Sequence, residues 1–101
     1  MGKAIPVTIG GEYFAKKGDL EDRIRLLISK YPLSSFVEGQ DRDFFLDLFK
    51  FHPRYEAKLG TGIVAMQIAM SEKHNNHCFY IHRADGSVDD ISWTKCVASI
   101  R

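Results

Sequence analysis

Apolar residues recur along the first third of the chain with two different periods, which predicts a strand followed by a helix. Residues 5–9 alternate apolar and other side chains at period two, typical of a short strand. Pro6 cannot donate to a sheet ladder, so this strand lies at a sheet edge or begins at Pro6, and Gly10-Gly11 ends it. Asp19 is the predicted N-cap of a helix that Pro32 stops. Its apolar face comprises Leu20, Ile24, Leu27, Ile28 and Tyr31.

A second helix is predicted from about Asp41 to about His52. Asp43 lies in its first turn, and Pro53 disfavours helical backbone in the residue before it. Its apolar stripe comprises Phe44, Phe45, Leu48 and Phe49. Five aromatic residues between positions 36 and 51 predict that this helix is the centre of the core.

The second half of the chain is typical of strands that end in a helix. Residues 63–70 form a long apolar run that indicates a buried strand, although its length also suits two helical turns. Residues 78–82 and 88–91 are predicted strands, joined by an Asp85-Gly86 turn, and the polar residues 71–77 suit a hairpin connection. Ser92 caps a last helix whose apolar face comprises Trp93, Cys96, Val97 and Ile100.

The order β-α-α-β-β-β-α predicts an α+β fold in a single domain over residues 1–101. We expect a largely antiparallel sheet of three or four strands, with about three helices packed on one face. The chain has 101 residues, 45% of them hydrophobic and 27% charged, which is an ordinary globular composition.

Charge and cysteine content narrow the possible environments of the protein. The formal net charge of +1 excludes the strong basic bias of many nucleic-acid-binding proteins. No apolar run reaches the ~18 residues of a membrane span, and the N-terminal residues do not form a secretion signal. The two cysteines are therefore expected to be reduced thiols of a cytoplasmic protein that does not bind membranes.

Two clusters contain residues that could bind a metal. Strand alternation puts Cys78 and His82 on one face and His77 on the other, so these three ligands do not converge on a zinc ion. A zinc site made from His77, Cys78 and Cys96 requires a particular docking of the last helix, so a polar loop beside a buried cysteine explains the pattern better. Asp85, Asp89 and Asp90 could hold a divalent cation or act as paired carboxylates. They match no EF-hand spacing and are better explained as turn and strand-end charges.

Catalytic and cofactor motifs are weak in this sequence. A nucleophilic cysteine needs a stabilised thiolate, whereas Cys96 lies on an apolar helix face. The loop Gly60-Thr61-Gly62 after Lys58 could bind a phosphate through its backbone N–H groups, but it is more typical of a simple turn. The sequence therefore predicts no catalytic residue, metal, cofactor or small-molecule substrate.

The remaining chemical signal is a group of cations interleaved with aromatic residues. Lys50, His52, Arg54 and Lys58 fall within nine residues, together with Phe51 and Tyr55. Cations next to stacking surfaces suit single-stranded or loop RNA, although such charges also commonly form a solvated rim.

Several segments of the second half occur in an order found in a known family. Residues 45–53, 58–63, 78–87 and 90–97 are similar to its patterns L-L-x-x-H-P, K-x-G-x-G, C-F-x-x-x-R-x-D-G-S and D-F-S-x-x-K-C. Ile91 stands where the last pattern favours Phe. The matching motif residues include Pro53, Gly60, Gly62, Cys78, Asp85, Gly86, Asp90, Ser92 and Cys96. The chain thus resembles the domain named for the plant protein "defective chloroplasts and leaves" (DCL), also known as a domain of unknown function.

The resemblance implies an association with RNA, because plant members are linked to plastid ribosomal RNA maturation and a similar domain ends the largest subunit of a plant-specific RNA polymerase. The first hypothesis is a non-catalytic RNA-binding or rRNA-processing accessory module, and its candidate contacts are Lys50, His52, Arg54, Lys58, Arg83 and Lys95. The second is a protein-interaction module that docks to a larger RNA-associated assembly. A nuclease using His52, Asp85 and Asp90 is a distant third. We also expect Arg83 to pair with Asp90 or Asp85 and fix the turn, or else to contact a phosphate.

Overall fold

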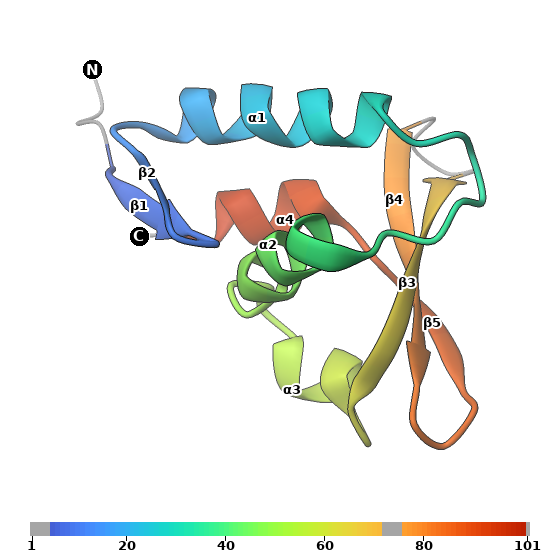
Figure 1. Cartoon of the computed structure of the whole chain (residues 1–101). Coiled ribbons are helices and arrows are strands. Elements are labelled where there is room, and N and C mark those ends of the chain that lie inside the picture. Colours follow the sequence, from blue (N-terminus) through green and yellow to red (C-terminus); the bar gives the residue numbers. More distant parts are fainter. Residues whose placement is uncertain (1–4, 72–75, 101) are drawn as a thin grey trace.

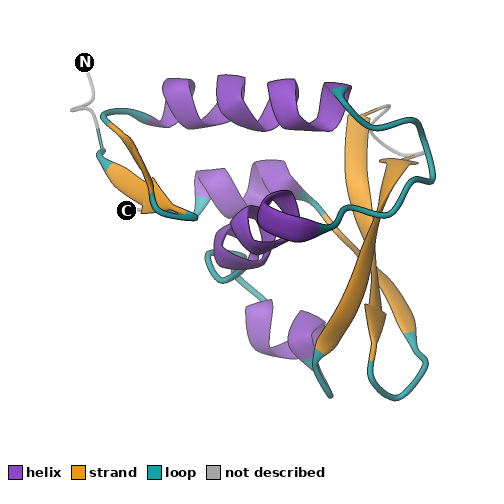
Figure 2. Cartoon of the chain, in the orientation of Figure 1, coloured by secondary structure: helices purple, strands orange, loops and turns teal. Residues whose placement is uncertain are grey.

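A computed structural model of the chain describes residues 5–71 and 76–100, so residues 72–75 of the expected hairpin connection, including His74, lie outside it. Figures 1 and 2 show four helices on one side of a twisted sheet, with a small hairpin at the N-terminal end. The elements in chain order are β1 (Val7–Ile9), β2 (Glu12–Phe14), α1 (Lys17–Ser29), α2 (Gly39–Phe49), α3 (Tyr55–Leu59), β3 (Ile63–Ser71), β4 (Asn76–Arg83), β5 (Val88–Ile91) and α4 (Trp93–Ala98).

The main sheet has three strands in the order β3-β4-β5, and both neighbouring pairs are antiparallel. The helices lie on one face of this sheet, and its other face carries no element of the described chain (Figure 1). The α+β prediction and the three predicted strands of the second half are confirmed. Residues 63–70 lie within a strand and not two helical turns.

The first predicted strand does not join the main sheet. β1 pairs with β2 in a separate two-stranded sheet that the sequence analysis did not predict. Gly10 and Gly11 join the two strands at φ values of 57° and 81°, so this pair turns a hairpin instead of simply ending a strand. The Gly10 N–H donates to Asp47 Oδ2 over 2.8 Å, and a Cβ at Gly10 would lie 3.0 Å from the Phe44 Cα. The hairpin therefore packs closely on α2.

Several helix boundaries differ from the predicted ones. Asp19 is not the N-cap of α1: Lys16 holds that position with extended backbone, and Asp19 lies in the first turn, where its charge favours the helix N-terminus. The second helix begins at Gly39 and ends at Phe49, both earlier than expected. The short helix α3 was not predicted. Ser92 does hold the N-cap position of α4, but its hydroxyl bonds Thr94 Oγ1 instead of a backbone N–H.

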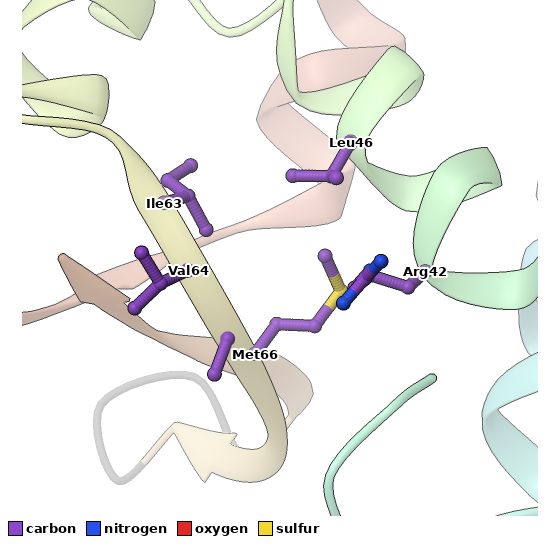
Figure 3. A pocket seen from close by; sticks show the side chains of 6 residues that line it. Arg42, Leu46, Ile63, Val64 and Met66 are labelled. Carbon is purple, nitrogen blue, oxygen red and sulfur yellow. The ribbon is translucent and has the colours of Figure 1, made fainter. Parts of the chain in front are cut away.

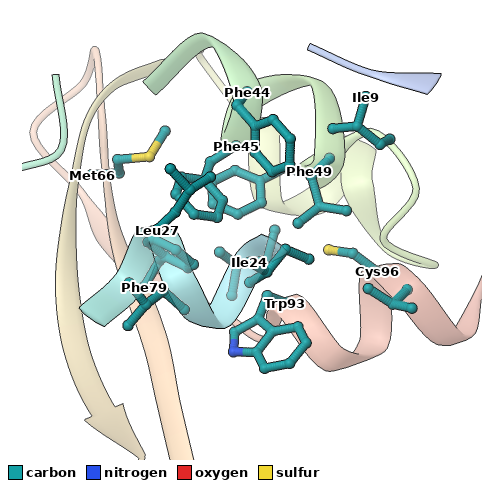
Figure 4. Packing of buried hydrophobic residues seen from close by; sticks show 14 of the residues in the cluster. Ile9, Ile24, Leu27, Phe44, Phe45, Phe49, Met66, Phe79, Trp93 and Cys96 are labelled. Carbon is teal, nitrogen blue, oxygen red and sulfur yellow. The ribbon is translucent and has the colours of Figure 1, made fainter. Parts of the chain in front are cut away.

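The core lies between α2, the inner face of the sheet, α1 and α4 (Figure 4). The Phe45 and Phe79 ring centroids are 4.6 Å apart, and those of Phe49 and Phe79 are 5.3 Å apart. The prediction that the second helix is the centre of the core is confirmed, since its four apolar stripe residues are buried. Trp93, Cys96, Val97 and Ile100 are also buried, as their spacing predicted. In contrast, Phe36 is 49% exposed.

Candidate nucleic-acid interface

Arg83, the last residue of β4, binds three other segments of the chain. Its Nε donates to the Lys58 carbonyl over 2.8 Å, and its Nη1 donates to Ser87 Oγ over 3.0 Å. Its Nη2 lies 2.8 Å from Asp89 Oδ2, and only 13% of the side chain is exposed. The guanidinium therefore joins α3, the turn and β5 in a planar set of charge-assisted bonds.

The expected partners of Arg83, Asp90 or Asp85, are wrong, because its carboxylate partner is Asp89. Ile81 is paired with Asp89 and Tyr80 with Asp90. Since side chains alternate along a strand, Arg83 shares a face with Ile81 and Asp89 and not with Asp90. The part of the expectation that made Arg83 a structural residue at this turn agrees with its contacts.

The glycine loop after Lys58 packs against the same guanidinium. Gly60 has φ 49° and ψ −120°, and a Cβ there would lie 2.9 Å from Arg83 Cδ. The neighbouring Thr61 Oγ1 accepts a bond of 3.2 Å from the Asp85 N–H. The close approach of the loop to Arg83 requires glycine at position 60, which favours the turn interpretation over a phosphate cradle.

Asp85 and Asp89 have different local roles in the hairpin. Asp85 accepts bonds from the Ser87 hydroxyl and N–H at 2.6 and 2.9 Å, and these bonds lower the pKa of its carboxyl. Burial alone would raise the pKa of Asp89, but the Asp90 N–H together with Arg83 and Lys58 lowers it below its usual value. Both carboxylates are thus used to hold the hairpin.

His52 is buried between α2 and α3, with only 6% of the residue exposed. Its Nδ1 accepts a bond of 3.0 Å from the Arg54 N–H. Burial lowers the pKa of His52, and the nearby charges of Lys58, Lys95 and Arg54 lower it further. His52 is therefore a buried residue whose ring is used in a contact inside the protein.

Two of those cations, Arg54 and Lys58, belong to α3 and its N-cap, and the third, Lys95, belongs to α4. Lys58 is 19% exposed, and its Nζ lies 3.4 Å from Asp89 Oδ1 and 3.5 Å from Asp90 Oδ1. Arg54 and Lys95 are exposed, and within the described part of the chain neither has a carboxylate within 4.0 Å. We call Arg54, Lys58 and Lys95 the basic cluster.

The structure thus separates the six candidate contacts into two groups. Lys50, at the C-cap of α2, is exposed and lies 3.7 Å from Asp47, and with Arg54 and Lys95 it remains accessible to a ligand. His52, Lys58 and Arg83 are engaged inside the protein.

The residues weighed as metal or nucleophilic sites are placed as follows. Cys78 and Cys96 are free and buried. Burial raises the pKa of both thiols, that of Cys96 to about 12. Among residues 5–71 and 76–100, no group of three His, Cys, Asp or Glu side chains is arranged to hold a metal ion. His52 and Asp85, two residues of the nuclease hypothesis, are held in separate structural contacts.

Sequence reasoning missed a second surface on the uncovered face of the main sheet. Tyr80 and Val88 are 46% and 54% exposed there. The Phe36 and His82 rings are 5.5 Å apart, and His82 Nε2 lies 2.5 Å from Gln67 Oε1. The signal was present in the alternation of β4, where Tyr80 and His82 face away from the core. We call Phe36, Tyr80, His82 and Val88 the open sheet face.

Comparison with known proteins links the chain to one family and to one solved structure. Residues 25–97 match the family described as "Protein of unknown function (DUF3223)". The solution NMR structure of an uncharacterized protein from Rhodospirillum rubrum is similar, with a TM-score of 0.81 and 31% sequence identity over 95% of this chain and 91% of that one. None of the helices in the described residues is long and apolar enough to cross a membrane.

Three Arabidopsis thaliana proteins are also similar in sequence. The chain is 26% identical over 98 residues to DNA-directed RNA polymerase IV subunit 1, and this alignment covers 95% of this chain and 7% of that subunit. It is 30% identical over 99 residues to Protein EMBRYO DEFECTIVE 514, covering 97% of this chain and 49% of that protein. It is 32% identical over 72 residues to DNA-directed RNA polymerase V subunit 1, and this alignment covers 66% of this chain and 4% of that subunit. The chain therefore spans about half or less of the length of these relatives.

Proposed function

Because this chain belongs to the family described as "Protein of unknown function (DUF3223)", the DCL family that its motifs indicated, we propose that it is a non-catalytic RNA-binding module that assists the maturation of a structured RNA such as ribosomal RNA. The observation that supports this proposal best is the basic cluster. Arg54 is the N-cap of α3 and Lys58 lies within that helix, whereas Lys95 comes from α4, and all three positive charges lower the pKa of His52. Two relatives are RNA polymerase subunits by name, which agrees with an RNA-associated setting.

The proposed contacts are Lys50, Arg54 and Lys95, whose side chains are exposed. Lys58 and Arg83 act as positioning residues. Their bonds hold α3, which follows Arg54, against the β4–β5 hairpin. Three phosphate contacts are few, so binding is modest and electrostatic. Each neutralised phosphate contributes about −0.7 to −0.9 to the slope of log K against log salt, so we expect a slope of roughly −2 to −3 for three contacts. The location of this activity is proposed to be the cytoplasm.

The test is fluorescence anisotropy of a labelled ribosomal RNA stem-loop at several salt concentrations. Arg54→Ala and Lys95→Ala should each weaken binding by about the same factor for RNAs of different sequence and reduce the salt slope by roughly 1. Lys16→Ala removes an exposed positive charge at the N-cap of α1 and is the matched control, for which we expect little change. Unchanged affinity in the Arg54 and Lys95 variants would contradict the proposal.

A second candidate function is docking to a protein of an RNA-associated assembly through the open sheet face. The observation in its favour is the exposure of Phe36, Tyr80 and Val88, because exposed apolar patches are typical of protein interfaces. Tyr80→Ser should abolish such docking and leave RNA affinity unchanged. If Tyr80→Ser instead lowers RNA affinity and the Arg54 variant does not, stacking on the open sheet face, and not the basic cluster, binds the RNA.

A further inference from the structure

A groove separates α2 from the first half of β3, and its lining residues include none of the basic cluster or of the open sheet face. Its volume is about 200 Å³, and its lining residues are Arg42, Leu46, Ile63, Val64, Ala65 and Met66. Figure 3 shows Arg42 and Leu46 extending from α2 towards β3, and Met66 extending from β3 towards Arg42. The groove thus has an apolar floor and a cation at one side.

The β3 strand is at the edge of the main sheet, and only part of that edge is covered. The segment before α2 covers the later part: the Val37 N–H donates to the Met66 carbonyl over 3.0 Å, and the Ile68 N–H donates to the Ser35 carbonyl over 2.9 Å. Among the described residues, no such bond from outside the sheet reaches 63–65. Residues 63–65 therefore form an unpaired strand edge next to the groove, within the part of the chain that the structure describes.

The uncovered stretch lacks the charges and proline that often protect an edge strand, and a register shift lies between Ile63 and Ala65. Natural edges commonly carry charges or proline, which discourage pairing with another chain. The opposite edge strand, β5, contains Asp89 and Asp90. Residues 63–65, Ile-Val-Ala, contain neither a charge nor proline, and Val64 is 58% exposed at a register shift. This edge is suited to receive a strand.

Arg42 determines which kind of strand fits. It is exposed, and no carboxylate of the described residues lies within 4.0 Å of it. An acidic residue of an incoming strand would supply the carboxylate partner that Arg42 lacks among the described residues. A second copy of this chain pairing edge to edge would bring Ile63–Met66, which contains no acid, and another Arg42.

We propose that the β3 edge and α2 form a docking groove for an extended peptide of a partner protein, in which an apolar side chain enters the pocket and a neighbouring carboxylate pairs with Arg42. The peptide adds a short strand to the sheet, so its main chain provides affinity and the pocket and Arg42 provide selectivity. This site is separate from the proposed RNA contacts and does not depend on them.

The test uses two capped nine-residue peptides, one alternating valine with aspartate and the other alternating valine with lysine. Titration into the ¹⁵N-labelled full chain should shift the amides of residues 42–46 and 63–66 with the aspartate peptide and slow the hydrogen exchange of the Val64 amide. Arg42→Glu should weaken binding of the aspartate peptide roughly five- to tenfold, because the exposed ion pair with the peptide carboxylate becomes a repulsion. The same variant should bind the lysine peptide more tightly. Lys16→Glu makes the same charge change elsewhere and should leave both affinities as they were.

A second variant tests the edge itself without removing the charge. Val64→Lys places a protecting charge on an exposed position and should abolish binding of both peptides while the unfolding midpoint stays close to that of the wild type. Equal binding of the two peptides to the wild type, or shifts confined to other residues, overturns the proposal. So does a concentration-dependent dimer that perturbs residues 63–66 without peptide, which would identify a second copy as the occupant. An RNA stem-loop that shifts the same amides overturns it as well.

Discussion

Replacing Arg83 by lysine tests whether the hairpin network is structural. Lysine keeps the positive charge near Asp89 but cannot form the planar fork that also reaches the Lys58 carbonyl and Ser87 Oγ. A hydrogen bond from a charged donor contributes about 1.5–3 kcal/mol, and the side chain is only 13% exposed, so water replaces these bonds poorly. With two such bonds lost and the charge contact with Asp89 kept, we expect Arg83→Lys to lower the free energy of unfolding by about 3 kcal/mol or more.

The assay is urea unfolding followed by tryptophan fluorescence, with Arg54→Lys as the control on an exposed arginine. We expect the control to lie within about 0.5 kcal/mol of the wild type. A double-mutant cycle with Asp89→Asn then separates the ion pair from the two other bonds. An Arg83→Lys variant as stable as the Arg54 control would refute the structural role, and loss of RNA affinity without loss of stability would make Arg83 a phosphate contact instead.

The same network predicts an acid dependence. The pKa of Asp89 is lower in the folded chain than its usual value, so its stabilisation is fully present above the unfolded pKa of about 3.9. That stabilisation is lost as the pH falls through the folded-state pKa. Asp89→Asn should therefore reduce the slope of unfolding free energy against pH below about pH 4. If this variant keeps the wild-type slope of unfolding free energy at acid pH, Asp89 does not contribute to that slope.

Three further predictions concern backbone, core and thiol chemistry. Gly60→Ala should lower the free energy of unfolding by about 2–3 kcal/mol in urea unfolding, because the backbone conformation is strained for alanine and the added Cβ would meet Arg83. The control is Gly18→Ala in α1, where the added Cβ has open space and the change should be neutral or slightly stabilising. Trp93→Ala should lower the free energy of unfolding by about 3–5 kcal/mol, measured by urea unfolding followed by circular dichroism, and a loss below 1 kcal/mol would contradict its assignment to the core. Cys96 should resist iodoacetamide in the native state at pH 8 and react once the chain is unfolded, since burial raises its thiol pKa to about 12; rapid native labelling seen by mass spectrometry would contradict this.

The sequence was sufficient for elements with enough residues to display a period. The stripes of α1, α2 and α4 and the three main strands were predicted because burial imposes spacing on many positions at once. The helix α3 has only five residues and no buried side chain, so no periodic signal exists. The strand β2 has three residues, and Gly10-Gly11 was interpreted as an end when its paired positive φ values make it a hairpin turn.

The candidate site was harder to predict because proximity in sequence does not reveal pairing. His52 and Lys58 lie among exposed cations in the sequence, yet one is buried and the other bonds two aspartates from a distant strand. Strand alternation could have distinguished Asp89 from Asp90 as the partner of Arg83. No sequence pattern could show that Lys95, more than forty positions from His52, lies close enough to lower its pKa.

The N-terminal hairpin and the rest of the fold are expected to differ in local stability. Two strands of three residues do not persist in water by themselves, so β1 and β2 depend on their packing against α2 and on the bond from Gly10 to Asp47. That bond joins residues 37 positions apart, and Ile9 and Phe14 attach the hairpin to the core. We expect the hairpin to open before β3–β5, with Ile9 and Phe14 leaving the core as it does so. Native-state amide exchange would then occur first at residues 7–14, and a protease would reach this segment before the rest of the fold.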